Sequence, residues 1–105
     1  LYKYILPEIS RRHLAYLHIG TFDFSKDWHS ILRSFYQGTY FAGVGFTKER
    51  AEKLLAEGGA EAIVFGTSYL ANPDLPERFA ENLELNTPDQ TTFYTPGEKG
   101  YTDYP

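Results

Sequence analysis

Cysteine and methionine are both absent from this sequence of 105 residues. The lack of cysteine excludes disulfides and metal sites built on thiolates, and an acidic, cysteine-free composition is common in the cytoplasm. No apolar run has the length that spans a bilayer, and the N-terminus lacks the basic head and apolar core of a signal peptide. We therefore expect a soluble, cytoplasmic chain with no membrane partner. Because Leu1 stands in the place of an initiator methionine, we also expect a piece of a longer protein.

Positive charge is scarce as well. The chain has 10 Lys and Arg against 14 Asp and Glu, and no basic cluster longer than Arg11-Arg12. The resulting net charge of −4 argues against nucleic acid or an acidic membrane surface as a partner. The hydrophobic content of 42% and the aromatic content of 17% exclude a disordered chain, and 105 residues accommodate one domain at most.

Strands and helices are expected to alternate along the chain. Apolar runs of strand length lie at residues 14–19, 39–44 and 62–65, and apolar residues at helical spacing lie between them. This order is typical of a parallel sheet with right-handed helical crossovers and predicts the α/β class. We expect residues 1–105 to form one segment of such a fold, with residues 84–105 as a polar, irregular C-terminal tail.

The signals that delimit the helices differ in strength. Residues 2–12 have helical spacing, but Pro7 should either begin that helix or bend it. Asp27 is suited to cap the next helix, residues 48–57 form a third, and Asn72, with a proline after it, should start the last one. The apolar residues expected on the inner faces of the last three helices are Trp28, Ile31, Leu32, Phe35, Ala51, Leu54, Leu55, Leu75, Phe79 and Leu83.

Two of the expected strands end in glycine shortly before a helix. Residues 62–65 run into Gly66, and residues 40–44 run into Gly45. A glycine in such a loop lets an anionic group approach the backbone, whose N–H groups can point at it. Each glycine alone is better explained as a tight turn without a ligand. As neighbouring loops of one parallel sheet, however, the two can share a phosphate.

Three parallel strands make an incomplete sheet. Their apolar runs require cover on both faces, and the two outer strands would leave backbone N–H and C=O groups unpaired at an edge. Either further chain or a second copy of this chain should therefore complete the architecture.

Five short motifs stand in order along the chain. They are Tyr16-Leu17-His18, Phe65-Gly66-Thr67-Ser68-Tyr69-Leu70-Ala71-Asn72-Pro73-Asp74-Leu75, Glu84-Leu85-Asn86, Thr92-Phe93-Tyr94 and Gly100-Tyr101-Thr102-Asp103-Tyr104-Pro105. Each motif alone is a weak signal, but the combination at this spacing is specific. It resembles the C-terminal portion of the Old Yellow Enzyme family over nearly the whole chain.

The resemblance implies that this chain forms strands six to eight of a TIM (β/α)8 barrel. Such a barrel would bind FMN and reduce activated C=C bonds of α,β-unsaturated carbonyls with NAD(P)H. By family precedent the residues at the cofactor, most of them at its phosphate, are Val44, Gly45, Gly66, Thr67 and Tyr94. The substrate pocket would be walled by Phe24, Phe93 and Tyr94.

Two departures from the family pattern bear on function. Where the family usually has arginine after the glycine of its last strand, this chain has Thr67, so a hydroxyl replaces a bidentate guanidinium at the phosphate. The family's carbonyl-binding histidine and asparagine (or two histidines) and its proton-donating tyrosine lie on earlier strands. No catalytic residue is therefore assigned in this chain.

Two functional hypotheses follow from the resemblance and its limits. In the first, the chain is the C-terminal part of an FMN-dependent ene-reductase, completed by the rest of the barrel or by a second copy. In the second, it is a non-catalytic half-barrel that associates through its exposed sheet edges.

The remaining polar and aromatic residues are expected to have structural roles. His18 has no second ligand at metal-binding spacing, so no metal site is predicted. His13 and His29 should lie on the surface, and Tyr101 and Tyr104 should pack within the tail.

Overall fold

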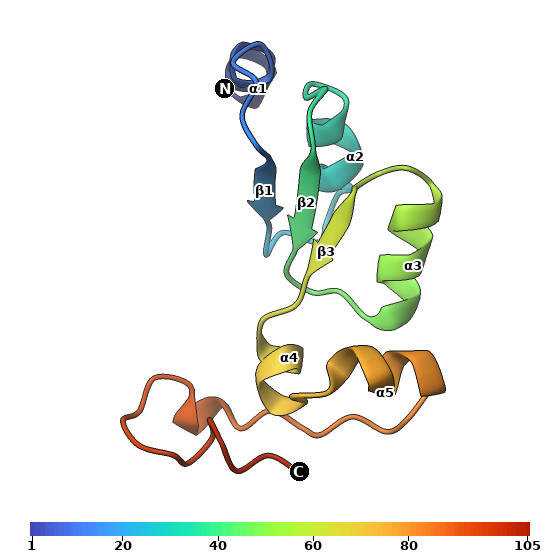
Figure 1. Cartoon of the computed structure of the whole chain (residues 1–105). Helices are drawn as coiled ribbons and strands as arrows, with labels where there is room; N and C mark the ends of the chain where they lie inside the picture. Colours follow the sequence, from blue (N-terminus) through green and yellow to red (C-terminus); the bar gives the residue numbers. More distant parts are fainter. The chain divides into compact units, whose positions relative to one another are not determined.

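The computed structural model covers residues 1–105, which form two units, 1–64 and 65–105. The first unit contains α1 (Tyr2–Ser10), β1 (Leu17–Gly20), α2 (Trp28–Arg33), β2 (Tyr40–Gly43), α3 (Lys48–Ala56) and β3 (Ala62–Val64) (Figure 1). The second unit contains α4 (Thr67–Ala71), α5 (Leu75–Glu81) and a 3-10 turn, η1 (Gln90–Thr92).

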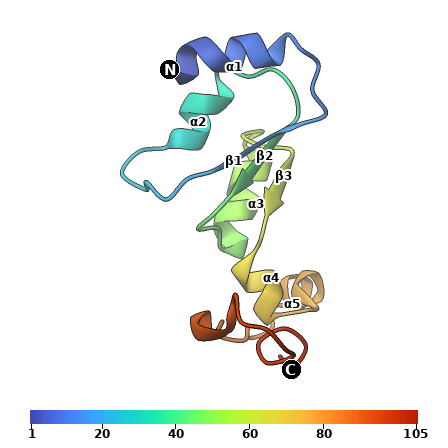
Figure 2. The same ribbon diagram turned by 90° about the vertical axis from the view of Figure 1, so that its left-hand side faces the viewer.

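The sheet of the first unit has three parallel strands in the order β1-β2-β3. Leu17 lies opposite Tyr40, and Phe41 lies opposite Ala62. Helices α2 and α3 return the chain from the end of one strand to the start of the next, as Figures 1 and 2 show. The parallel α/β arrangement predicted from the sequence is confirmed. Within this chain β1 and β3 each pair with one strand, so each keeps one unpaired edge.

The core of this unit lies between the sheet and its helices. Alternate residues of β2 point to the same face, and on that face Tyr40 and Ala42 are fully buried. Leu32 of α2 is buried in the same cluster, and Leu54 of α3 packs against it, so both helices cover one face of the sheet. On the opposite face Tyr16 and Phe41 stack with their ring centroids 4.6 Å apart.

Several expected positions differ from the structure. Helix α1 begins at Tyr2 and contains Pro7, so a start at Pro7 is wrong. Ile31, Leu55 and Leu83 are exposed rather than part of inner faces. Helix α2 has only six residues and presents a narrow stripe around Leu32, while Leu83 lies beyond the end of α5.

Glu61 ties the start of β2 to the chain that enters β3. Its carboxylate accepts a hydrogen bond from the Tyr40 backbone N–H at 2.7 Å and pairs with the Arg33 guanidinium at 2.5 Å. Burial opposes ionisation of Glu61, but the Tyr40 hydrogen bond and the Arg33 charge outweigh it and lower the pKa of Glu61 below its usual 4.5. The ionised carboxylate therefore stabilises the folded sheet.

The second unit corrects the expected helix start at Asn72. Helix α4 begins directly after Gly66, and Asn72 closes it instead of opening the next helix, whose N-cap is Asp74. Asn72 is buried, and both ends of its side-chain amide form hydrogen bonds. Nδ2 donates to the Ser68 carbonyl at 2.9 Å, and Oδ1 accepts from the Asn86 N–H at 2.7 Å. The asparagine thus ties the helices to the tail.

Arg78 joins α5 to the C-terminal tail through four hydrogen bonds. Its Nε donates to Asp74 at 2.7 Å and one terminal nitrogen donates to Asn72 Oδ1 at 3.0 Å. The guanidinium also donates to the backbone carbonyls of Glu84 at 3.2 Å and Pro105 at 2.6 Å. A planar fork with five donors suits this convergence of acceptors, and the side chain is only 14% exposed.

Replacing Glu61 with glutamine should make the stability of the first unit less sensitive to acid. Because the folded-state pKa of Glu61 is depressed, its contribution is present above pH 4.5 and is lost as the pH falls through the folded-state value. We expect Glu61→Gln to lower the free energy of unfolding by about 1 kcal/mol at pH 7 and to flatten its decline below pH 4.5. Urea unfolding followed by circular dichroism at pH 7 and at lower pH measures both effects.

The matched control for this variant is Glu57→Gln, at an exposed carboxylate 4.0 Å from Lys53. It should change stability by a few tenths of a kcal/mol at most. Equal losses in the two variants would show that Glu61 makes no special contribution.

Replacing Arg78 with lysine should release the tail of the second unit. Lysine keeps the charge but cannot span the side-chain and carbonyl acceptors together, and the part-buried oxygens of Asn72 and Asp74 would each lose a donor. We expect a loss of about 2 kcal/mol and faster hydrogen exchange in residues 84–105, measured by mass spectrometry. Lys99→Ala, at an exposed cation of the same unit, is the control. Unchanged exchange in Arg78→Lys would contradict the role of this network.

Candidate functional site

The loop after β2 has an unusual backbone. Val44 and Gly45 both adopt the left-handed region, with φ of 71° and 73°. Glycine accepts this conformation, but a β-branched valine there is a genuine outlier that costs roughly 1–3 kcal/mol. Such strain persists only where surrounding contacts impose it. The two residues expected at a phosphate therefore form a loop held in one particular shape.

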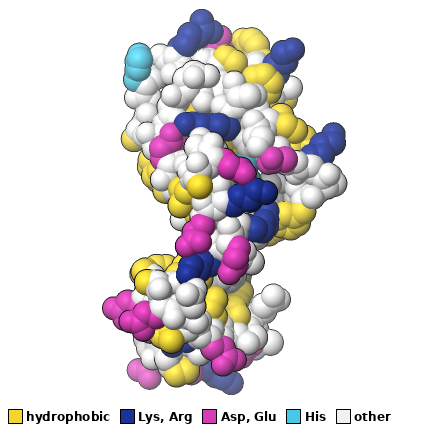
Figure 3. All heavy atoms as spheres, turned by 90° about the vertical axis from the view of Figure 1, so that its right-hand side faces the viewer, with side chains coloured by type: hydrophobic (Ala, Val, Ile, Leu, Met, Phe, Trp, Pro, Cys, Tyr) yellow, Lys and Arg dark blue, Asp and Glu magenta, His cyan; other side chains and the backbone are white.

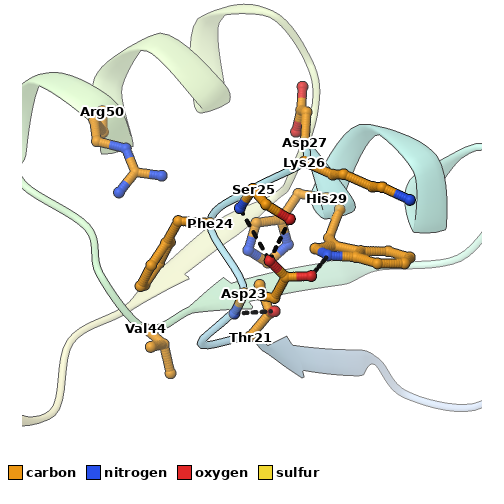
Figure 4. Close-up of a pocket in the computed structure, with 10 residues that line it drawn as sticks. Thr21, Asp23, Phe24, Ser25, Lys26, Asp27, His29, Val44 and Arg50 are labelled. Carbon is orange, nitrogen blue, oxygen red and sulfur yellow. Dashed lines mark hydrogen bonds between the residues drawn. The ribbon is translucent and has the colours of Figure 1, made fainter.

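Side chains from two other segments surround this loop. Phe24, from the loop after β1, lies against Gly45 so closely that an added Cβ would be 2.6 Å from its ring. Arg50, in the first turn of α3, donates a hydrogen bond to the Gly45 carbonyl. The Arg50 guanidinium also lies 5.2 Å from the Phe46 ring centroid and 6.0 Å from that of Phe24. In the view of Figure 4, Arg50 and Val44 lie on either side of Phe24.

Phe24, Val44 and Arg50 line part of a cavity of about 330 Å³ within the first unit. Its remaining wall comes from the segment between β1 and α2 and from the start of α2 (Figure 4). The lining residues are Thr21, Asp23, Phe24, Ser25, Lys26, Asp27, Trp28, His29, Val44 and Arg50.

Asp23 holds the segment that carries Phe24. Its carboxylate accepts from the Ser25 N–H at 3.0 Å, the Ser25 hydroxyl at 2.5 Å and the Trp28 indole N–H at 2.8 Å. These hydrogen bonds, that of the Ser25 hydroxyl foremost, lower the pKa of Asp23 to about 2. Asp23 is therefore ionised at neutral pH and has no proton to give.

The prediction that His29 lies on the surface is wrong, because His29 is buried inside the first unit. Asp27 caps α2 by accepting from the Ser30 N–H at 3.2 Å, and this start turns the second residue of the helix toward the sheet. His29 Nδ1 lies 2.8 Å from the buried Tyr40 hydroxyl. Burial lowers the pKa of His29 and raises that of Tyr40, so both are neutral at pH 7. His13 is exposed, as expected.

The second glycine loop belongs to the other unit. Gly66 is the N-cap of α4, and nothing lies within 4 Å of a Cβ added there. Thr67 is the exposed first residue of that helix. The backbone at Gly66 is thus open to a ligand. The sharing of one phosphate between this loop and the one at Val44 and Gly45 remains a prediction.

The aromatic residues expected at the pocket have mixed surroundings. Tyr94 is 98% exposed in the second unit, and the Phe93 carbonyl accepts a hydrogen bond from the Tyr101 hydroxyl. Phe24 is also exposed on its outer side, although it packs on Gly45. Their role as walls of a substrate pocket stays a prediction. Tyr104 packs within the tail, where its hydroxyl accepts from the Asp89 N–H at 2.8 Å.

No group of three or more His, Cys, Asp or Glu side chains is arranged to hold a metal ion. None of the helices is both long enough and apolar enough to cross a membrane. On the face drawn in Figure 3, acidic and basic side chains are interspersed, and no patch of a single sign gathers there.

Comparison with curated proteins finds relatives of the same kind. A probable flavin mononucleotide-dependent alkene reductase of Leishmania infantum is 43% identical over 108 residues. A 12-oxophytodienoate reductase-like protein of Solanum lycopersicum is 39% identical over 107 residues. Both alignments include 100% of this chain and 30% of the relative, so the chain spans about 30% of the length of these relatives. No family model matches the chain.

Solved structures agree with these relatives. The old yellow enzyme from Trypanosoma cruzi matches 100% of this chain and 29% of its own, with a TM-score of 0.92 and 35% identity. Morphinone reductase, at 39% identity, matches 99% of this chain and 30% of its own with a TM-score of 0.87. A further match is to morphinone reductase in complex with tetrahydroNAD, which covers 99% of this chain and 29% of its own at 39% identity and a TM-score of 0.84.

The parallel strands, their crossover helices and the glycine loops at the strand ends define the last three βα units of a TIM (β/α)8 barrel. More particularly, the chain belongs by sequence and by fold to the Old Yellow Enzyme family and corresponds to its C-terminal portion. Sequence reasoning had found both glycine loops. It missed Arg50, whose only signal was its place in the first turn of the helix that follows Gly45.

A pair of glycines with the same backbone conformation tests how tightly the loop is held. Gly45 and Gly58 both have φ of 73°, but Gly58 has nothing within 4 Å of an added Cβ. Gly58→Ala should cost about 1 kcal/mol for the left-handed alanine alone, and Gly45→Ala a further 1–3 kcal/mol because its Cβ displaces Phe24. Urea unfolding gives both values. Equal losses would show that Phe24 does not hold the loop, as would a full penalty for Gly45→Ala in a Phe24→Ala background.

Proposed function

We propose that this chain supplies FMN phosphate-binding loops and one wall of the substrate pocket to an ene-reductase barrel. The reaction would be the reduction of the activated C=C bond of an α,β-unsaturated carbonyl, with NAD(P)H as the reductant. The observation that carries the proposal is the Val44–Gly45 loop, held in a left-handed shape at the carboxyl end of a barrel strand. In such barrels a phosphate commonly binds at the loops after strands seven and eight.

The second loop fits a phosphate most directly. The surroundings of Gly66 are open where a Cβ would stand, whereas at Gly45 the Phe24 ring occupies that space. Thr67 presents an exposed hydroxyl that can donate to a phosphate oxygen. When bound, FMN would supply the hydride transfer between the nicotinamide and the alkene. The names of the relatives, an FMN-dependent alkene reductase among them, support this assignment.

The other residues of this chain would shape the pocket and donate no proton. Phe93 and Tyr94 would wall it, together with Phe24 from the loop after β1. Asp23 is ionised, and the hydroxyl of Tyr40 is buried against His29. A general acid must reach the reacting atom directly or through one water. As the family resemblance implies, the proton for the substrate would come from a residue outside this chain.

A second candidate is a non-catalytic half-barrel that associates through its sheet. It is favoured by the unpaired edges of β1 and β3, which expose backbone N–H and C=O groups. The occupant of these edges would be the rest of a barrel or a second copy of the chain. Sedimentation decides whether copies pair: a monomer at all concentrations with a cooperative melt would contradict self-association.

Replacing Thr67 with arginine should strengthen the binding of FMN but not of riboflavin, which has no phosphate. A charge-assisted, bidentate contact replaces a hydroxyl, so the dissociation constant for FMN should fall about tenfold. Flavin fluorescence quenching measures both ligands. Thr102→Arg adds the same charge to the tail and is the control. An unchanged FMN affinity in Thr67→Arg would count against a phosphate site at Gly66. No binding of FMN by any variant would contradict cofactor binding by this chain alone.

A further inference from the structure

Arg50 contacts both the backbone of the loop after β2 and the aromatic side chains beside that loop. It donates to the Gly45 carbonyl, and its guanidinium lies near the rings of Phe24 and Phe46. The side chain is itself placed by Thr47, whose hydroxyl accepts from the Arg50 N–H at 3.2 Å and caps α3. Arg50 thus connects the start of α3, Phe24 in the loop after β1, and the backbone of Gly45.

The loop needs such a connection because its conformation is strained. Val44 has φ of 71°, which a valine adopts only when its neighbours leave no alternative. A Cβ added at Gly20 would lie 3.1 Å from Val44 Cγ2. The valine side chain therefore packs against Gly20, at the end of β1. On the other side, the Arg50 hydrogen bond fixes the orientation of the Gly45 carbonyl. The direction of the Phe46 N–H is fixed with it, since the Gly45 carbonyl and the Phe46 N–H belong to one planar peptide unit.

The charge of Arg50 is not neutralised by a carboxylate. The ion pairs of the chain involve Arg11, Arg33, Lys53 and Arg78, but not Arg50. Asp23 and Asp27, the acidic residues of the cavity, accept hydrogen bonds from Ser25, Trp28 and Ser30 instead. One guanidinium donor is used by Gly45, so a positive charge with open donors stands beside the proposed phosphate loop. Position 67, where the family resemblance implies a cation, has none.

From these contacts we infer that Arg50 is the positioning residue that makes the Val44–Gly45 loop prefer a phosphorylated flavin. It holds the loop through the Gly45 carbonyl and supplies a positive charge beside that loop. This inference rests on the proposed function, because it assigns a residue to the same phosphate site. Phe24 assists by closing over Gly45 and Arg50.

The test compares FMN with riboflavin in the 105-residue chain and in Arg50→Gln, Arg50→Lys and Lys53→Gln. Lys53→Gln removes the same charge from an exposed site of the same helix. Titrations followed by the backbone NMR signals of Val44, Gly45 and Phe46 also detect millimolar affinities. We expect Arg50→Gln to weaken FMN binding about tenfold without changing riboflavin binding, and Arg50→Lys to recover part of the loss. Lys53→Gln should behave as the parent.

A second measurement does not depend on flavin binding. Backbone chemical shifts and couplings of Val44 and Gly45 report φ, and they should depart from the left-handed values in Arg50→Gln but not in Lys53→Gln. The inference is overturned if these values stay the same, or if Arg50→Gln keeps the parent's preference for FMN over riboflavin. If the parent chain shows no preference for FMN while the loop still relaxes in Arg50→Gln, it is the proposed phosphate site that fails.

Discussion

The central strand β2 is the constraint on which the first unit depends. Both neighbouring strands pair with it, and Tyr40 at its start is fully buried. Glu61 holds the Tyr40 backbone N–H, Arg33 lies 5.7 Å from its ring, and His29 contacts its hydroxyl. Every polar group of Tyr40 that burial removes from water thereby has a partner, which a stable core requires. Because β2 is fixed at its start, the position of its end is fixed as well.

The loop at the end of β2 contains the residues that we propose for the phosphate site. The chain leaves the strand through Val44 and Gly45, a strained pair that is enclosed by Phe24 and held by Arg50. Strain of this kind is found where a site must be shaped before its ligand arrives. The hydrogen bonds of Asp23 to Ser25 and Trp28 contribute to this shape, because they hold the segment that places Phe24 against Gly45. A loop prepared in this way is compatible with the phosphate binding that we propose.

In the second unit, side-chain hydrogen bonds hold the irregular C-terminal tail in place. Asn72 and Arg78 gather the carbonyls and amides of residues that no helix or strand satisfies, including those of Glu84, Asn86 and Pro105. Buried polar networks of this kind are stable only when nearly every member is paired. This explains why the Asn-Pro-Asp-Leu motif is a structural centre of the unit as well as a family signature.

The sequence by itself determined the α/β class, the parallel order of strands, the cap at Asp27, both glycine loops and the family. Each of these is encoded in local periodicity, in turn residues or in motifs that stand close together. Only the tertiary structure decided the burial of His29, the role of Asn72, the left-handed Val44 and the contact of Arg50 with Gly45. These features depend on packing between segments, as when Phe24 closes on Gly45, and no local pattern records which side chains will meet.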